Sequence, residues 1–133
     1  MVVVPNLSSA CALREHGLTY NQMVVGQQLS PDEVDRIFGA LADATRRDIL
    51  TRVLDHEEPV SGLAARYDMS FAAVQKHVAV LERAGLVTKR AQGRERLVRG
   101  EVERTRAVGR LLDDYEEIWR GRIAALDELL DET

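Results

Sequence analysis

The sequence predicts a mostly α fold with a small β-hairpin (α+β), and three observations support this fold class. Apolar residues recur at helical spacing in segments from residue 31 to the C-terminus. Two of the expected helices, 61–67 and 71–84, are separated by a tight turn. The next stretch is basic and has the pattern of two strands joined by a turn at Gln92 and Gly93. Two helices followed by a basic hairpin are typical of a winged helix-turn-helix, which places a helix in the major groove of DNA and a wing on its backbone.

Two helices are expected before the helix-turn-helix. The first covers 31–41, with Ser30 as its cap, Pro31 in its first turn and Glu33 closing a capping box. Its apolar face consists of Val34, Ile37, Phe38 and Leu41. The second covers 44–56 after a cap at Asp43. Its inward residues are expected to be Ile49, Leu50, Val53 and Leu54.

The helix-turn-helix and the wing follow. Ser61 is expected to cap helix 61–67, and Ser70 is expected to cap helix 71–84. The buried face of the second helix repeats at steps of four and three residues, at Val74, Val78 and Leu81. Gly85 suits the left-handed position after a helix. The wing strands are expected at 86–91 and 95–98.

A single long helix is predicted over 101–131. Its stripe repeats at alternating steps of four and three residues: Val108, Leu112, Tyr115, Trp119, Arg122, Leu126 and Leu129. Except for Arg122 these residues are apolar or aromatic, and the stripe is widened by Leu111, Ile118 and Leu130. Such a stripe is too wide for a small helical core to cover. We therefore expect a homodimer, with an interface that includes Val34, Phe38, Leu112, Tyr115, Trp119, Leu126 and Leu129.

The chain of 133 residues is expected to form one DNA-binding and dimerisation domain, 30–133, after a loose arm at 1–29. No apolar run approaches the roughly 20 residues that span a bilayer. The first residues do not have the pattern of a signal peptide. We therefore expect a cytoplasmic protein without a membrane partner. The single cysteine, Cys11, excludes an intrachain disulfide.

Charge is distributed unevenly along the chain. The segment Val60 to Gly100 has eight basic and three acidic residues, a net charge of +5. The whole chain has a net charge of −4, so the remainder has −9. Positive charge gathered in one segment of an acidic protein indicates an anionic partner, here double-stranded DNA.

The outward face of helix 71–84 contains the residues expected to reach DNA. Gln75 is the best candidate for a base contact, because its amide can bond adenine N6 and N7 together. Ser70 and the free N–H groups beside it suit a phosphate, and Lys76 is expected to reach the backbone. Phe71 or Ala72 could contact a thymine methyl group.

The other candidate contacts are basic residues of the wing and a histidine. The wing residues Lys89, Arg90, Arg94 and Arg96 are expected to hold phosphates or the minor groove, which positions the domain more than it specifies sequence. His77 lies between the exposed and buried faces of its helix. A structural bond across the turn is favoured for it over base reading or metal binding, and it stays among the candidates.

The segments LADATRRDIL (41–50) and SGLAARYDMSFAAVQKHVAVLERAGLV (61–87), with the Gly-Arg wing tip, resemble the ArsR-type (ArsR/SmtB) transcriptional repressors. The resemblance covers about 31–133. It implies a homodimeric winged helix protein that binds a palindromic operator and represses nearby genes. It also implies that the first and last helices build the dimer interface.

Two departures from that family concern metal sensing. Helix 61–67 lacks the Cys-containing ligand set of the metal-sensing members. The last helix, 101–133, has neither His nor Cys, although other members bind zinc there through Asp and His. The sequence therefore predicts a member without metal sensing and without a cofactor. It does not identify a small-molecule inducer.

The sequence leaves one alternative function and argues against another. A winged helix can act as a protein–protein interaction module, for which a wing without basic excess would be expected. An enzyme is not expected, because the sequence has no catalytic grouping, Gly-rich phosphate loop or metal-ligand spacing.

Overall fold

The structure is a computed structural model that describes residues 29–131. Except for Leu29, the predicted arm at 1–29 lies outside the described residues. The chain forms two compact units, one of residues 32–105 and one to which 106–131 belong. Each unit is described by itself, and a single domain over 30–133 stays a prediction.

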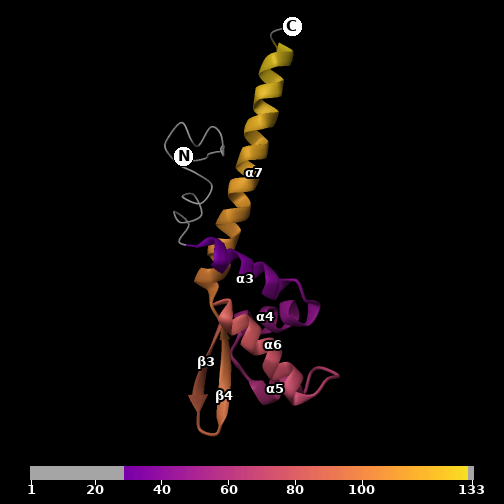
Figure 1. The fold of residues 1–133 in the computed structure, drawn as a ribbon, viewed down its shortest axis with the longest axis vertical. Coiled ribbons are helices and arrows are strands. Elements are labelled where there is room, and N and C mark those ends of the chain that lie inside the picture. Colours follow the sequence, from indigo (N-terminus) through magenta and orange to yellow (C-terminus); the bar gives the residue numbers. More distant parts are fainter. Residues whose placement is uncertain (1–28, 132–133) are drawn as a thin grey trace. The chain divides into compact units, whose positions relative to one another are not determined.

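The predicted fold class is confirmed: the protein is mostly helical, with the small antiparallel sheet of a winged helix-turn-helix (Figure 1). The helices are α3 (Pro31–Leu41), α4 (Ala44–Asp55), α5 (Val60–Ala64), α6 (Phe71–Arg83) and α7 (Val102–Asp131). The strands are β2 (Glu58–Pro59), β3 (Val87–Gln92) and β4 (Glu95–Gly100). Most ends agree with the predicted ones to within a residue or two, as expected where helices and strands fray.

Local chemistry determines where the main helices begin and end. The Asp43 carboxylate accepts a hydrogen bond from the Arg46 N–H at 3.0 Å, which confirms it as the cap of α4. The Ser70 hydroxyl oxygen accepts from the Ala73 N–H at 3.1 Å, which confirms the cap of α6. After α6, Gly85 has a φ of +76°, in the left-handed region that glycine adopts without strain.

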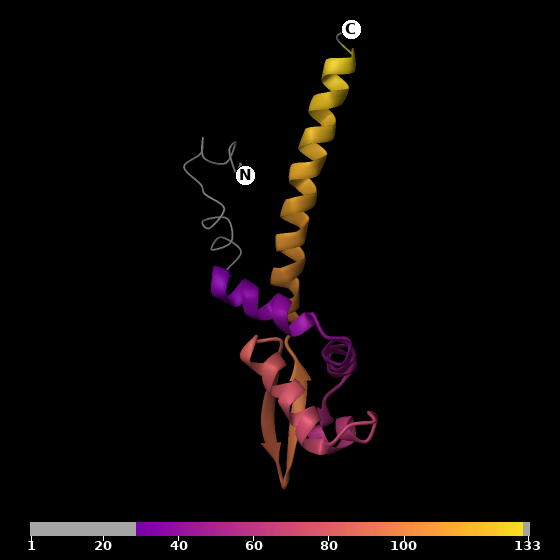
Figure 2. The same ribbon diagram turned by 45° about the vertical axis from the view of Figure 1, so that its right-hand side comes forward.

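The core of the first unit lies between the helices and one face of the sheet. Figures 1 and 2 show α6 lying alongside the hairpin of β3 and β4. The buried face of α6 is confirmed, since Val74, Val78 and Leu81 are at most 1% exposed. The prediction was wrong for Leu54, which is 39% exposed. Leu54 lies over β4, where a Cβ at Gly100 would approach its Cδ2 to 2.6 Å.

Helix α5 differs from the predicted helix. It covers Val60–Ala64 instead of 61–67, and its N-cap residue is Pro59. The cap predicted at Ser61 was therefore wrong. The Ser61 hydroxyl instead donates to Glu95 Oε1 at 3.1 Å, at the start of β4. The chain enters this helix directly from β2, so Ser61 is already inside it.

A third strand was not predicted. Strand β2 pairs antiparallel with β4 through Glu58↔Val98 and Pro59↔Leu97, which gives the sheet order β2-β4-β3. Strand β4 extends to Gly100, two residues beyond its predicted end, because Gly100 still pairs with Val87. The wing is thus joined to the rest of the unit through its strand β4, which pairs with β2 shortly after the end of α4.

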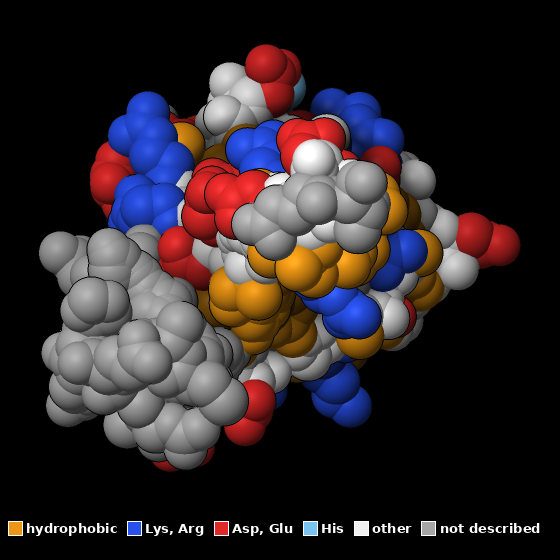
Figure 3. Space-filling model, turned by 90° about the horizontal axis from the view of Figure 1, so that it is seen from above, with side chains coloured by type: hydrophobic (Ala, Val, Ile, Leu, Met, Phe, Trp, Pro, Cys, Tyr) orange, Lys and Arg blue, Asp and Glu red, His pale blue; other side chains and the backbone are white. Residues whose placement is uncertain are grey.

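Helix α7 is one continuous helix of 30 residues, and its residues from Arg106 on belong to the second unit. Its buried residues are Ala107, Val108 and Leu111. Beyond them the apolar side chains are exposed: Leu112, Tyr115, Ile118, Trp119, Ile123, Leu126, Leu129 and Leu130. Figure 3 shows hydrophobic side chains gathered in a patch on the surface that it draws. None of the helices among the described residues is long and apolar enough to span a membrane.

Candidate nucleic-acid interface

The outward face of α6 is open, as the sequence predicted. Phe71, Ala72, Gln75 and Lys76 are exposed, and so is the capping residue Ser70. Phe71 is 49% exposed at the first position of the helix, which is unusual for an aromatic side chain. Within residues 29–131, neither the Gln75 amide nor the Lys76 ammonium has a hydrogen-bond or ion-pair partner. These groups are available to a ligand at the surface of the helix.

His77 faces α4. The Arg46 guanidinium donates from Nη1 to His77 Nδ1 at 3.2 Å, and the Asp43 carboxylate lies 3.9 Å from the same nitrogen. Arg46 is itself fixed by hydrogen bonds to the carbonyl oxygens of Ala40 and Gly39. This arrangement gives His77 a structural contact that holds α6 against the start of α4.

The wing has two classes of basic residue. Arg94 and Arg96, at the tip, are exposed, and neither forms an ion pair with another part of the described chain. Nearer the body, Lys89 lies 3.3 Å from Glu82 Oε1. Arg90 forms two hydrogen bonds to Glu57, from Nε to Oε2 and from Nη2 to Oε1, both 3.0 Å long. The structure brings the four predicted wing residues onto one hairpin, but two of them already have acidic partners.

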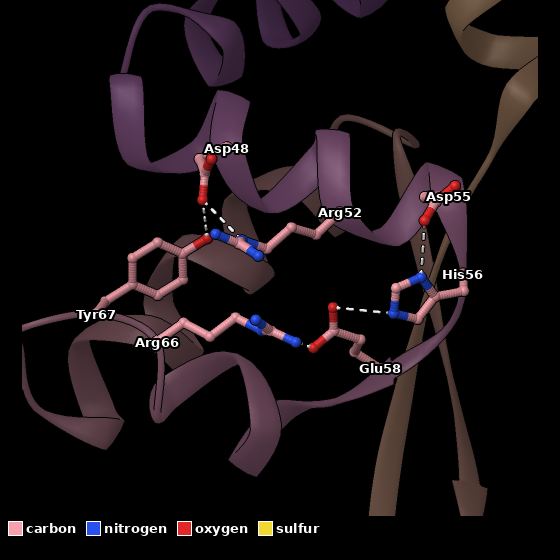
Figure 4. A network of polar contacts seen from close by, with 7 residues as sticks. All are labelled: Asp48, Arg52, Asp55, His56, Glu58, Arg66 and Tyr67. Atoms are coloured by element: carbon pink, nitrogen blue, oxygen red, sulfur yellow. Dashed lines mark hydrogen bonds and ion pairs between the residues drawn. The ribbon is translucent and has the colours of Figure 1, made fainter.

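A polar network fixes the turn that leads into α6 (Figure 4). The Tyr67 hydroxyl donates to Asp48 Oδ2 at 2.6 Å, and Arg52 Nε donates to the same oxygen at 2.9 Å. These bonds lower the pKa of Asp48. Burial, reinforced by the bond to Asp48, raises the pKa of Tyr67 to about 12. The turn is therefore tied to α4 by a hydroxyl that stays protonated at physiological pH.

The same network reaches the base of the wing. Glu58 on β2 is only 5% exposed, and its Oε1 accepts from Arg66 Nε at 3.0 Å. Its Oε2 has no hydrogen-bond partner among the described residues, although His56 Nε2 lies 3.4 Å away. His56 also contacts the Asp55 carboxylate, 3.0 Å from Nδ1 (Figure 4). Because Arg66 and Tyr67 adjoin each other, one turn is bonded both to α4 and to the sheet.

Sequence reasoning missed Glu57 and Glu58. They fall between the predicted helices 44–56 and 61–67, and β2 is too short to show an alternating pattern. The signal available in the sequence was their charge, because two adjacent carboxylates lie between the second and third predicted helices, before the basic hairpin. Spacing alone could not pair Glu57 with Arg90, which is 33 residues away.

No group of three or more His, Cys, Asp or Glu side chains is placed to hold a metal ion within the described part of the chain. Cys11 and His16 lie outside that part. The carboxylates on α7 therefore do not form a recognisable ligand set in one copy of the chain.

Residues 43–89, which contain α4, α5, α6 and the start of β3, match the family model "Bacterial regulatory protein, arsR family". Over 71 residues the chain is 41% identical to an uncharacterised HTH-type transcriptional regulator, YuzN, of Bacillus subtilis. That match covers 48% of this chain and 77% of the relative. Over 97 residues it is 33% identical to the HTH-type transcriptional regulator Rv2034 of Mycobacterium tuberculosis, covering 73% of this chain and 88% of the relative.

Solved structures agree with these matches. An ArsR-like transcriptional regulator from Rhodococcus sp. RHA1 has a TM-score of 0.66 at 33% identity, covering 74% of this chain and 92% of that one. The homodimeric winged helix-turn-helix DNA-binding domain of a possible ArsR-family regulator from Mycobacterium bovis has a TM-score of 0.54 at 27% identity. This second match covers 62% of this chain and 80% of that one. The matched proteins are transcriptional regulators by name, which agrees with the expectation that the chain is not an enzyme. The chain belongs to the ArsR family of winged helix-turn-helix, DNA-binding transcriptional regulators.

Proposed function

We propose that this regulator is a homodimeric repressor that binds a palindromic operator through α6 and the wing. The observation that carries the proposal is the open face of α6, where the Gln75 amide, the Lys76 ammonium and a capped helix start are exposed together. A regulator that represses must hold its operator tightly enough to exclude other proteins. The ArsR resemblance of the segments around α4 and α6 supports repression over activation.

Sequence reading is assigned to α6. Gln75 bonds an adenine edge in the major groove, and the buried residues Val74 and Val78 on either side fix its direction outward. The N–H groups of Phe71 and Ala72, beside the Ser70 cap, bind a phosphate. Lys76 binds the backbone on the flank of the groove. His77 does not read a base in this proposal, because it faces Arg46 and Asp43.

Backbone binding is assigned to the tip of the wing. Arg94 and Arg96 have no internal partner to lose, so their charge is available to phosphates or to a narrow minor groove. Lys89 is ion-paired with Glu82, and its phosphate contact stays a prediction. The tip therefore positions the domain, while α6 supplies the preference for one sequence.

A second copy of the chain is proposed to cover the apolar stripe of α7. The exposed stripe residues include Leu112, Tyr115, Trp119, Leu126 and Leu129. A monomeric protein rarely exposes so many large apolar side chains on one helix. The homodimeric Mycobacterium bovis domain with the same fold supports this state. Phe38, 39% exposed on α3, and its half-buried neighbour Val34 are proposed to contribute to the same interface.

The test is selection of DNA. The purified full chain is mixed with a pool of random duplexes, and the bound fragments are sequenced through several rounds. We expect a two-fold symmetric motif with half-sites about one helical turn apart, since a dimer presents two copies of α6. A promoter containing the selected motif should lose transcription when the protein is present.

Two results would contradict the proposal. Enrichment of a single half-site would exclude the palindrome, and stimulation of the promoter would exclude repression. Recovery of no motif, with binding instead to another protein, would favour the interaction module.

A further inference from the structure

The structure divides the basic residues of the wing by what they already bind. We propose that Arg90 is a positioning residue, which with Glu57 holds the wing at a fixed angle so that Arg94 and Arg96 reach the DNA backbone. This inference rests on the proposed DNA-binding function. It assigns to Arg90 a role different from the phosphate contact expected from sequence.

The first argument is the geometry of the Arg90–Glu57 pair. Nε and Nη2 of one guanidinium each donate at 3.0 Å to a different oxygen of one carboxylate. Such two-bond pairing fixes orientation as well as distance, which a single contact does not. The bonds from Arg90 also lower the pKa of Glu57, so the carboxylate remains ionised and paired at neutral pH.

The second argument is where the pair lies in the sheet. On β4, Leu97 pairs with Arg90 of β3 on one side and with Pro59 of β2 on the other. Glu57 directly precedes β2, so the Arg90–Glu57 pair bridges the two outer strands across the central one. Two-stranded ribbons vary widely in twist, and a bridge across a third strand restricts that motion. The pair is therefore placed to fix the hairpin against the body.

The third argument is the contrast with the tip. Arg90 is 56% exposed and could be solvated, yet it is bonded to Glu57. Arg94 and Arg96 have no such partner within residues 29–131. A phosphate that bound Arg90 through Nε and Nη2, the two-bond edge of the guanidinium, would have to displace Glu57 and break both charge-assisted hydrogen bonds. The tip arginines would break none.

A charge-retaining substitution separates the two roles. Lysine can hold a phosphate as a point charge but cannot reproduce the two-bond fork. Arg90→Lys should therefore weaken binding to the selected duplex by about two- to five-fold, the range expected for losing an exposed ion pair. The slope of log affinity against log salt should not change. Arg120→Lys, which alters an exposed arginine paired with Glu116 outside the wing, is the matched control and should bind like the unaltered protein.

Substitution of the acidic partner sharpens the test. Glu57→Ala removes a negative charge near the wing, which by simple electrostatics would strengthen DNA binding. If Glu57 positions the wing, this variant should instead bind about as weakly as Arg90→Lys. The double variant should bind no more weakly than either single one, because both remove the same bridge. Arg94→Ala should lower the salt slope by about one unit.

The measurements are binding isotherms at several salt concentrations on the selected duplex, with unfolding midpoints to show that each variant is folded. The inference is overturned if Arg90→Lys binds like the unaltered protein. It is also overturned if Glu57→Ala binds more tightly, or if the two effects add. Failure of the unaltered protein to bind any duplex would overturn the proposed function and this inference with it.

Discussion

Helices α6 and α7 have the same apolar spacing but different surroundings. Both repeat large apolar residues at steps of four and three. In α6 these side chains are buried by its own chain, and Val74 and Val78 are almost completely inaccessible. In α7 the repeat becomes exposed after Leu111, and Trp119 is 57% accessible. The period of a helix therefore identifies its apolar face, but it does not tell whether the same chain or another copy covers that face.

The largest expected effect is on the covered helix. Val78→Asp places a carboxylate at a position that is 1% exposed, which should cost about 3–5 kcal/mol of the free energy of unfolding. A domain of this size has a total stability of about 5–15 kcal/mol. Thermal unfolding followed by circular dichroism should show a large loss. Gln75→Asp, which puts the same residue on the exposed face of α6, is the control and should unfold near the unaltered midpoint.

The next effect concerns the uncovered helix. Trp119→Asp should leave the monomer folded, because this side chain is already exposed, but it should prevent dimer formation and operator binding together. Sedimentation at micromolar concentration would measure the loss. Gly121→Asp lies on the opposite side of α7, where a Cβ meets nothing within 4 Å, and should remain dimeric. An unaltered protein that sediments as a monomer would contradict the whole comparison.

A smaller effect is expected on the polar face of α6. Gln75→Ala should cost about 1–3 kcal/mol on the operator and little on a scrambled duplex, because only the operator presents the matching base. Isotherms on both duplexes measure the difference. If the substitution weakened binding to both duplexes equally, Gln75 would contact the DNA backbone instead of a base.

No effect is expected from metals at the polar face of α7. Its acidic residues include Asp113, Asp114, Glu116 and Glu117, and one of them, Glu116, is paired with Arg120 at 3.1 Å. Zinc, cadmium or arsenite added to the protein–operator complex should not release the DNA. Stoichiometric dissociation would show that an inducer site exists. The variant Cys11→Ser would then test whether the single thiol takes part.

The helix-turn-helix was largely readable from sequence because its signals are local. Asp43 and Ser70 bond residues three positions away, and Gly85 acts through its own backbone. Short-range rules failed at Ser61, whose hydroxyl bonds Glu95 on the wing instead of capping its helix. They also failed at Leu54, whose exposure depends on how α4 crosses β4 at Gly100.

In the candidate interface, too, features that depend on local signals were predictable and features that depend on long-range contacts were not. The open face of α6 follows from helical period, because a buried face defines its opposite. The wing does not follow in this way. The sequence does not distinguish its five basic residues, namely Lys89, Arg90, Arg94, Arg96 and Arg99. Only the fold shows that Arg90 is bonded to Glu57, Arg99 to Glu101 and Lys89 to Glu82.

Local patterns predicted the order of the helices and of the two hairpin strands, the buried face of α6 and the net positive charge of the segment 60–100. These depend on contacts within a few residues, on period and on composition. The tertiary structure decided that β2 joins the wing, that Tyr67 and Arg66 anchor the turn before α6, and which arginines remain without an internal partner. Each of these depends on contacts between residues distant in sequence, which the folded backbone brings together and which no local pattern encodes.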